Sequence, residues 1–110
     1  MFIDLAGRSI PIDKDGYLRN LGDWSEEVAL KLAVAEGIQM TEQHWEVIYL
    51  LRDFYQEFEL SPAMRALVKQ VSKKLGEEKG RSVYLLQLFP PSPARIATKI
   101  AGLPRPANCF

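Results

Sequence analysis

Residues 41–59 read TEQHWEVIYLLRDFYQEFE, a stretch with clear helical periodicity. Thr41 is a residue type that caps helices. The apolar positions that follow recur at helical spacing: Trp45, Ile48, Tyr49, Leu51, Phe54, Tyr55 and Phe58. Because this stripe is wide, we expect the helix to be the centre of the core.

Further helices are expected on the C-terminal side of this stretch. Ser-Pro pairs at 61–62 and 92–93 each predict a helix start, since proline at the first helical position loses no hydrogen bond. Gly76 and Gly102 end these two helices. A short apolar segment at 83–89 predicts another helix between them.

The N-terminal side predicts a hairpin and one more helix. Residues 2–12, FIDLAGRSIPI, place two short apolar runs around a turn, which is typical of a β-hairpin. Helical spacing then runs to Gly37, with either Asp23 and Glu26 or Ser25 alone as the cap.

Together these patterns predict a mainly α fold in a single domain. We expect a helical bundle of about five helices with an N-terminal β-hairpin and an extended C-terminal arm. The hairpin region would occupy 1–20, the bundle 21–102 and the arm 103–110. A chain of 110 residues can bury a core without a metal or a disulfide.

Charge is zero overall but unevenly distributed. Residues 1–60 contain five Lys and Arg against twelve Asp and Glu, a net charge of −7. Residues 61–110 contain nine against two, a net charge of +7. This asymmetry indicates an anionic partner, or an acidic protein surface, near the C-terminal half, but attraction between the two halves or simple solvation explains it equally well.

The chain carries no sign of export. One cysteine cannot form an internal disulfide, and the N-terminus MFIDLAGRS lacks the positive charge and apolar run of a signal peptide. The longest uncharged apolar stretch, at 47–51, is far too short to cross a bilayer. We therefore expect a cytoplasmic protein with a reduced thiol and no membrane partner.

Cys109 is the strongest candidate for chemistry, because no other group in the chain looks catalytic. Pro104 and Pro106 lack N–H donors and favour an extended arm, whose eight residues can span about 26 Å. Arg105 and Lys99 would supply positive charge that favours the thiolate. The alternative is a frayed terminus that carries an incidental cysteine.

Other sites find little support. His44, the only histidine, falls in the first turn of a core helix, where a packed or surface role is commoner than catalysis. Acidic residues are scattered and glycines fall singly, so we expect no metal and no cofactor. The helices joined by GEEKG at 76–80 could form a helix-turn-helix, but the segment 83–89 is too apolar to lie in a groove. DNA binding is therefore a minor alternative.

Short motifs with a distinctive order run along the whole chain. They are GYL at 16–18, EGI at 36–38, HWEVI at 44–48, RDFYQEF at 52–58, SPAMRALVK at 61–69, GEEKG at 76–80, YLLQLFP at 84–90 and ATKIAGLPRPANCF at 97–110. In these motifs the chain resembles the TusE and DsrC family of small sulfur-carrier proteins. A penultimate cysteine after KIAGLP is the most specific of them.

The resemblance implies a role in sulfur transfer. Family members bind sulfur as a persulfide at the penultimate cysteine, which is Cys109 here. Members from dissimilatory sulfur metabolism carry a second cysteine eleven residues earlier, where this chain has Thr98. The chain therefore resembles the single-cysteine TusE branch. That branch relays sulfur towards 2-thiolation of the wobble uridine in tRNA, from a TusBCD-type donor complex to the thiouridylase MnmA, without a cofactor.

Two other functions stay open. A regulatory nucleic-acid-binding protein would use the basic half of the chain. A DsrC-like partner of sulfite reductase would need the second sulfur that Thr98 lacks. The sequence also leaves open whether the protein is better called a sulfurtransferase enzyme or a carrier, and whether it contacts tRNA directly or only through the thiouridylase.

Overall fold

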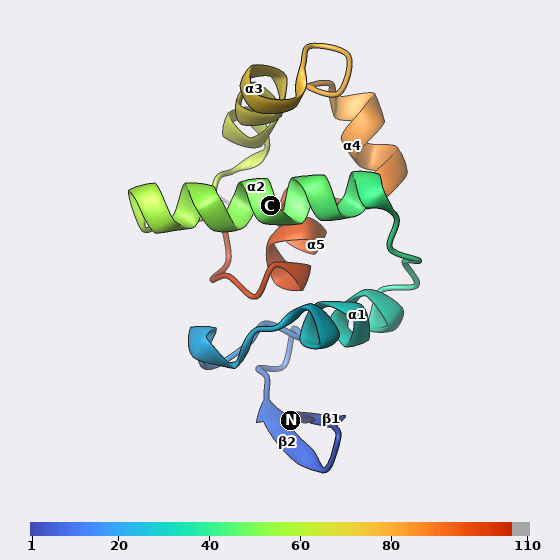
Figure 1. Ribbon diagram of the computed structural model, residues 1–110, viewed down its shortest axis with the longest axis vertical. Coiled ribbons are helices and arrows are strands. Elements are labelled where there is room, and N and C mark those ends of the chain that lie inside the picture. The colour runs from blue at the N-terminus through green and yellow to red at the C-terminus, as the bar shows by residue number, and fades with distance from the viewer. Residues whose placement is uncertain (107–110) are drawn as a thin grey trace.

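The computed structural model describes residues 1–106. This part of the chain forms a two-stranded antiparallel hairpin, a 3-10 helix and five α-helices (Figure 1). The elements are β1 (Phe2–Leu5), β2 (Arg8–Pro11), η1 (Leu21–Asp23), α1 (Glu26–Ala35), α2 (Glu42–Phe58), α3 (Met64–Leu75), α4 (Ser82–Leu88) and α5 (Pro93–Ile100). The predicted mainly α fold with an N-terminal hairpin is confirmed.

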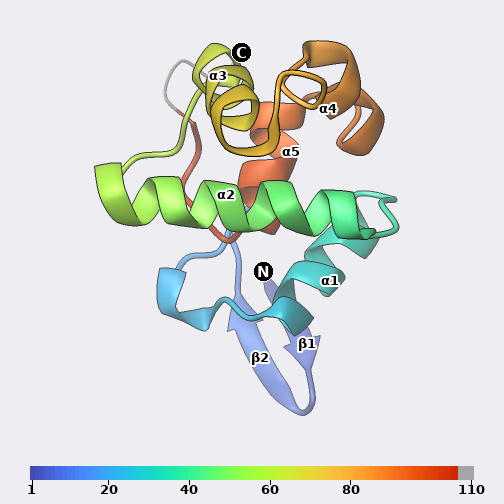
Figure 2. The same ribbon diagram turned by 45° about the horizontal axis from the view of Figure 1, so that its top comes forward.

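Helix α5 lies at the centre of the bundle. It contacts α1 and α2, and also α3 and α4 on the side away from the hairpin (Figures 1 and 2). Six of its eight residues are buried, and only Arg95 and Lys99 are not. A helix that is apolar around most of its circumference has to be enclosed by other elements. The prediction that 41–59 forms the centre of the core is therefore wrong, because α5 takes that place.

Helix α2 packs one face against α5 and α3. Its buried apolar residues are all aliphatic: Val47, Ile48, Leu50 and Leu51. The aromatic side chains Tyr49 and Phe58 are nearly half exposed. The predicted stripe was wider than the buried face, because aromatic rings at its edges cover the core with one side and meet solvent with the other.

The starts of α1 and α3 test two predictions about helix caps. Ser25 caps α1 through its side-chain oxygen, whereas Asp23 belongs to η1. The prediction that a helix starts at the Ser-Pro pair 61–62 is wrong, since α3 starts at Met64. The Ser61 hydroxyl is engaged elsewhere, donating to the Pro104 carbonyl oxygen at 2.6 Å, and so does not cap the helix.

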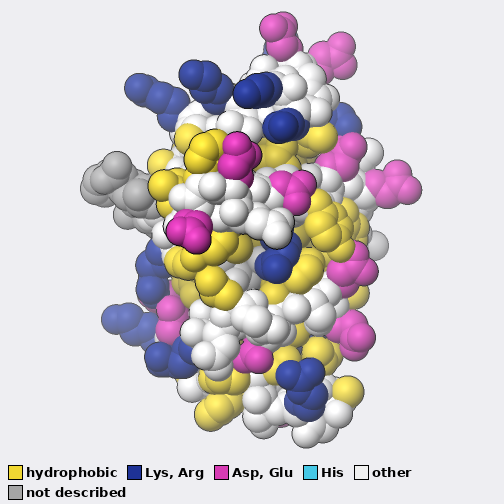
Figure 3. All heavy atoms as spheres, turned by 60° about the vertical axis from the view of Figure 1, so that its left-hand side comes forward, with side chains coloured by type: hydrophobic (Ala, Val, Ile, Leu, Met, Phe, Trp, Pro, Cys, Tyr) yellow, Lys and Arg dark blue, Asp and Glu magenta, His cyan; other side chains and the backbone are white. Residues whose placement is uncertain are grey.

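The fold brings the acidic and basic halves together only in part. Within residues 1–106, ion pairs join Lys79 to Glu46, Lys99 to Glu36, and Arg105 to Asp13 and Asp15. Figure 3 shows further Lys and Arg side chains gathered at the top of the molecule, at the height of α3. Attraction between the halves thus explains some of the charge asymmetry and leaves the cations of α3 unexplained.

Candidate functional site

Cys109 lies outside the described residues, so its place and its chemistry stay predictions. The structure does describe the segment that leads to it, from the end of α5 to Pro106. We call residues 99–106 the arm root. How this segment is held decides where the arm leaves the body of the protein.

A Schellman motif turns the chain from α5 into the arm. The Leu103 N–H donates to the Thr98 carbonyl oxygen at 3.1 Å, and the Gly102 N–H donates to that of Lys99 at 3.0 Å. Gly102 has a φ of +73°, which glycine adopts without strain. A β-carbon at Gly102 would lie 2.3 Å from Cδ1 of Trp24, so the turn also needs glycine for space. The predicted glycine stop at this position is confirmed.

Three side chains from separate parts of the fold hold the backbone of the arm root. Trp24 Nε1 donates to the Ile100 carbonyl oxygen at 2.9 Å, Arg52 Nη1 to that of Ala101 at 2.7 Å, and Ser61 Oγ to that of Pro104 at 2.6 Å. We call Trp24, Arg52 and Ser61 the collar. The Arg52 guanidinium also lies over the Trp24 ring, 3.9 Å from its centroid. Trp24 and Arg52 satisfy carbonyl groups that the end of α5 leaves unpaired, and Ser61 holds the chain beyond the turn.

The arm root is only partly exposed. Leu103 is only 3% exposed and packs in the core, and Pro106 is also buried. Pro104 and Arg105 are exposed. The predicted arm over 103–110 is therefore not free of the bundle at Leu103 and Pro106, because the Schellman turn directs the chain back onto the bundle.

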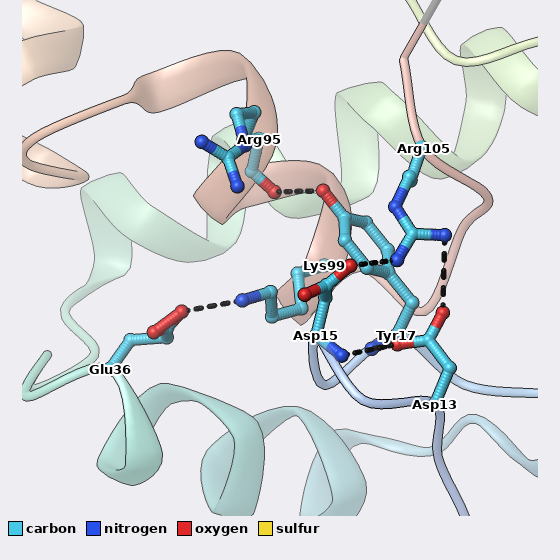
Figure 4. A network of polar contacts seen from close by, with 7 residues as sticks. All are labelled: Asp13, Asp15, Tyr17, Glu36, Arg95, Lys99 and Arg105. Carbon is cyan, nitrogen blue, oxygen red and sulfur yellow. Dashed lines mark hydrogen bonds and ion pairs between the residues drawn. The ribbon is translucent and has the colours of Figure 1, made fainter. Parts of the chain in front are cut away.

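Both cations that were expected to assist Cys109 have carboxylate partners (Figure 4). Lys99 Nζ lies 2.7 Å from Glu36 Oε1, and Arg105 pairs with Asp15 and, at 3.3 Å, with Asp13 Oδ2. Lys99 and Arg105 also lie over the ring of Tyr17, 5.4 and 4.8 Å from its centroid. The structure thus brings the two cations together around Tyr17, and their assistance to the thiolate stays a prediction.

The backbone turn that follows Asp13 holds its carboxylate in place beside Arg105. Its Oδ1 accepts hydrogen bonds from the N–H groups of Asp15 and Tyr17 at 2.9 and 3.0 Å. Burial, the largest single influence, raises the pKa of Asp13, but the two hydrogen bonds and the charges of Arg105 and Arg19 outweigh it and lower the pKa. The hydrogen bond to Asp15, first among several causes, raises the pKa of Arg105.

Thr98 lies in the most enclosed part of α5. Its side chain has no exposed surface, and its hydroxyl has no hydrogen-bond partner among the described residues. A buried hydroxyl without a partner costs folding free energy and cannot replace a thiol in sulfur chemistry.

His44 has a structural role. It is buried, its Nδ1 lies 3.1 Å from the Thr41 backbone nitrogen, and its Nε2 lies 2.8 Å from the Leu88 carbonyl oxygen. These partners assign the proton to Nε2, so that Nδ1 accepts from Thr41 and Nε2 donates to Leu88. Nδ1 therefore completes the cap of α2 itself, and Nε2 joins α2 to the end of α4.

Residues 1–106 contain neither a cluster that could bind a metal nor a helix that could cross a membrane. No group of three or more His, Cys, Asp or Glu in that part of the chain could hold a metal ion. None of its helices combines the length and the apolar character that crossing a membrane requires.

Sequence reasoning missed the collar. Trp24, Arg52 and Ser61 lie far apart in the chain, and their common target is a set of backbone carbonyls that no local pattern reveals. Two of them did fall within quoted motifs, Arg52 in RDFYQEF and Ser61 in SPAMRALVK. That was the only signal available.

Comparison with known proteins places the chain in a family. The family model described as DsrC like protein matches residues 4–110. The chain belongs to this DsrC-like family, and the resemblance seen in its motifs is confirmed.

Individual relatives match over nearly their whole length. Sulfurtransferase TusE of Yersinia pestis is 57% identical over 108 residues, covering 98% of this chain and 99% of that protein. The NMR structure of Allochromatium vinosum DsrC has a TM-score of 0.91 at 46% identity, covering 99% of this chain and 97% of that one. The crystal structure of the oxidized gamma-subunit of the dissimilatory sulfite reductase (DsrC) from Archaeoglobus fulgidus has a TM-score of 0.87 at 36% identity, with both chains fully covered.

Proposed function

We propose that this protein is a sulfur carrier that accepts persulfide sulfur on Cys109 and passes it on for 2-thiolation of the wobble uridine in tRNA. Its relatives are named sulfurtransferase TusE, which supports a role in sulfur relay. The observation that carries the proposal is the single cysteine placed next to last. The fully buried Thr98, eleven residues earlier, offers no second thiol.

The chemistry is an exchange between a thiolate and a persulfide. The Cys109 thiolate attacks the outer sulfur of a donor cysteine persulfide, and a new S–S bond forms at Cys109. The donor's S–S bond breaks, and its electron pair leaves with the donor thiolate. The chain gains one sulfur atom and needs no external oxidant or reductant. In the transfer to the acceptor, the Cys109 persulfide is the donor. The acceptor thiolate attacks its outer sulfur, and the Cys109 thiolate leaves.

The arm root supports this chemistry by fixing the base of the arm. The collar and the pairs made by Arg105 hold the described part of the arm, up to Pro106, at a fixed place on the bundle. A TusBCD-like complex would be the donor, and an MnmA-like tRNA thiouridylase would be the acceptor, both in the cytoplasm.

Intact mass after incubation with a persulfide donor tests the proposal. We expect one added sulfur on the wild-type chain, none on Cys109→Ser, and one on Thr98→Ala, since the buried hydroxyl takes no part. All three chains should fold alike, because Cys109 lies beyond the core helices and the Thr98 change removes only a small buried group.

The second measurement is tRNA thiolation in the presence of the thiouridylase. Wild type and Thr98→Ala should support it, and Cys109→Ser should not. Undiminished thiolation with Cys109→Ser would refute the relay and favour the regulatory nucleic-acid-binding function.

A further inference from the structure

The outer face of α3 carries a row of cations. Arg65, Lys69 and Lys73 recur every four residues, are all exposed, and make no ion pair with any residue in 1–106. We call these three residues the basic stripe. Helix α3 contains four cations and no Asp or Glu in twelve residues.

The basic stripe faces away from the core. Leu67 and Val71 are the fully buried residues of α3, and the stripe residues fall on the opposite side of the helical wheel. The fourth cation, Lys74, instead lines a groove of about 240 Å³ between α3 and α2, together with Asp53 and Glu57. The acidic side chains of α2 therefore border the groove and lie away from the stripe.

The stripe is unfavourable for the isolated helix. Like charges four residues apart on a helix repel each other, and a cation in the first turn, as at Arg65, opposes the helix dipole. Residues 1–106 offer these charges no carboxylate within ion-pair distance. Such an arrangement is expected where the compensation comes from a bound anion.

The character of the stripe favours a phosphate backbone over an acidic protein. Successive cations are about 6 Å apart along the helix axis, which gives a regular row of charge. Helix α3 exposes no large hydrophobic side chain, whereas protein interfaces centre on apolar and aromatic residues and are poor in lysine. Phosphate binding needs only such basic side chains.

We propose that the basic stripe of α3 binds the phosphate backbone of tRNA directly while Cys109 delivers sulfur. The choice of tRNA rests on the proposed function, whereas the site itself rests on the charge and exposure of α3. Figure 3 shows this basic end of the molecule presented to solvent over a broad area. In this arrangement the carrier contacts the RNA as well as the protein acceptor.

The test compares two variants of equal charge. R65Q/K69Q/K73Q removes the stripe, and R8Q/K14Q/K31Q removes three exposed cations from β2, the turn after it and α1, at the other end of the molecule. Binding of a labelled, unmodified tRNA transcript to each full chain is followed by fluorescence anisotropy over a series of salt concentrations.

The stripe variant should bind at least about tenfold more weakly at low salt, and its slope of log K against log salt should fall by about three. The control variant should keep the wild-type affinity and slope. Equal losses in both variants, or none in the stripe variant, would overturn the proposal. Tighter binding of a labelled polyglutamate peptide than of tRNA at the stripe would also overturn it, in favour of an acidic protein.

Sulfur loading separates this proposal from the proposed function. The stripe variant should accept one sulfur at Cys109 as the wild type does, because the stripe takes no part in the exchange. If Cys109 loads normally and the stripe variant binds tRNA like the wild type, only the inference about α3 fails. If tRNA binding maps to the stripe but Cys109 takes up no sulfur, only the sulfur relay fails.

Discussion

The arm root and the outer face of α3 both carry cations, but these cations have different partners in the two regions. At the arm root, Lys99 and Arg105 each have a carboxylate partner and lie over Tyr17. On α3, the basic stripe has no such partner among residues 1–106. The difference teaches that the paired charges of the arm root fix the geometry of the chain there, whereas the cations of the basic stripe make no ion pair within residues 1–106 and are free to serve a partner.

The largest expected effect is at the turn into the arm. Gly102→Ala should lower the free energy of unfolding by roughly 3 kcal/mol, because alanine is strained at positive φ and its β-carbon would meet Trp24 at 2.3 Å. Urea unfolding measures it. Gly37→Ala is the matched control: its φ of +72° is similar but its β-carbon meets nothing within 4 Å, so we expect a loss of about 1 kcal/mol. Equal losses at both positions would show that Trp24 does not restrict the turn.

A smaller effect is expected from one collar residue. Ser61→Ala removes the hydrogen bond to the Pro104 carbonyl oxygen and should cost about 1 kcal/mol in urea unfolding. Ser9→Ala serves as the control, since its exposed hydroxyl makes only a long contact of 3.4 Å to Asp4, and it should change stability by a few tenths of a kcal/mol at most. If Ser61→Ala were as mild as Ser9→Ala, the collar would not hold the arm root.

The charge pairing at the arm root predicts a pH response at Asp13. Because the folded-state pKa of Asp13 is lowered, its contribution to stability is complete above the unfolded pKa of about 3.9 and is lost as the pH falls through the folded value. Arg105→Gln should raise the pKa of Asp13 towards its ordinary value. Carboxyl NMR titration of wild type and variant measures this shift, and an unchanged Asp13 pKa would mean that Arg105 does not interact with it in solution.

The smallest effect is expected on α3, and it has the opposite sign. R65Q/K69Q/K73Q should leave the free energy of unfolding unchanged or raise it by a few tenths of a kcal/mol, because it relieves repulsion between like charges four residues apart. Thermal unfolding measures the effect. A clear loss of stability would mean that these cations serve the fold itself and would remove the contrast with the arm root.

Much of the fold could be predicted from local signals. The glycine stop at Gly102 depends on a few neighbouring residues and was confirmed, and so was the helix after Thr41. The central place of α5 was not predicted, because enclosure depends on how many elements pack around a helix. Ser61 was misread for the same reason: its hydroxyl bonds to a carbonyl 43 residues away and does not cap the next helix.

The sequence predicts the chemistry of the candidate site, but it does not predict which side chains hold the arm root. A single cysteine next to last, with nothing else suited to catalysis, was visible in the sequence. The partners of Lys99 and Arg105 were not, because Glu36 and Asp13 lie in a distant part of the chain and the overall charge asymmetry does not say which pairs form. The collar depends on backbone acceptors, which carry no sequence signature.

In the proposed relay, the attachment of the arm root limits the distance between the bundle and a sulfur on Cys109. The last held residue, Pro106, lies four residues beyond Gly102, after which the predicted arm of 103–110 begins. The α-carbon of Cys109, three residues beyond Pro106, can then lie no more than about 11 Å from it. A donor or an acceptor must therefore approach the body of the carrier closely and offer its own sulfur near the rim of its surface. Such a short tether favours shallow reactive sites over deep ones.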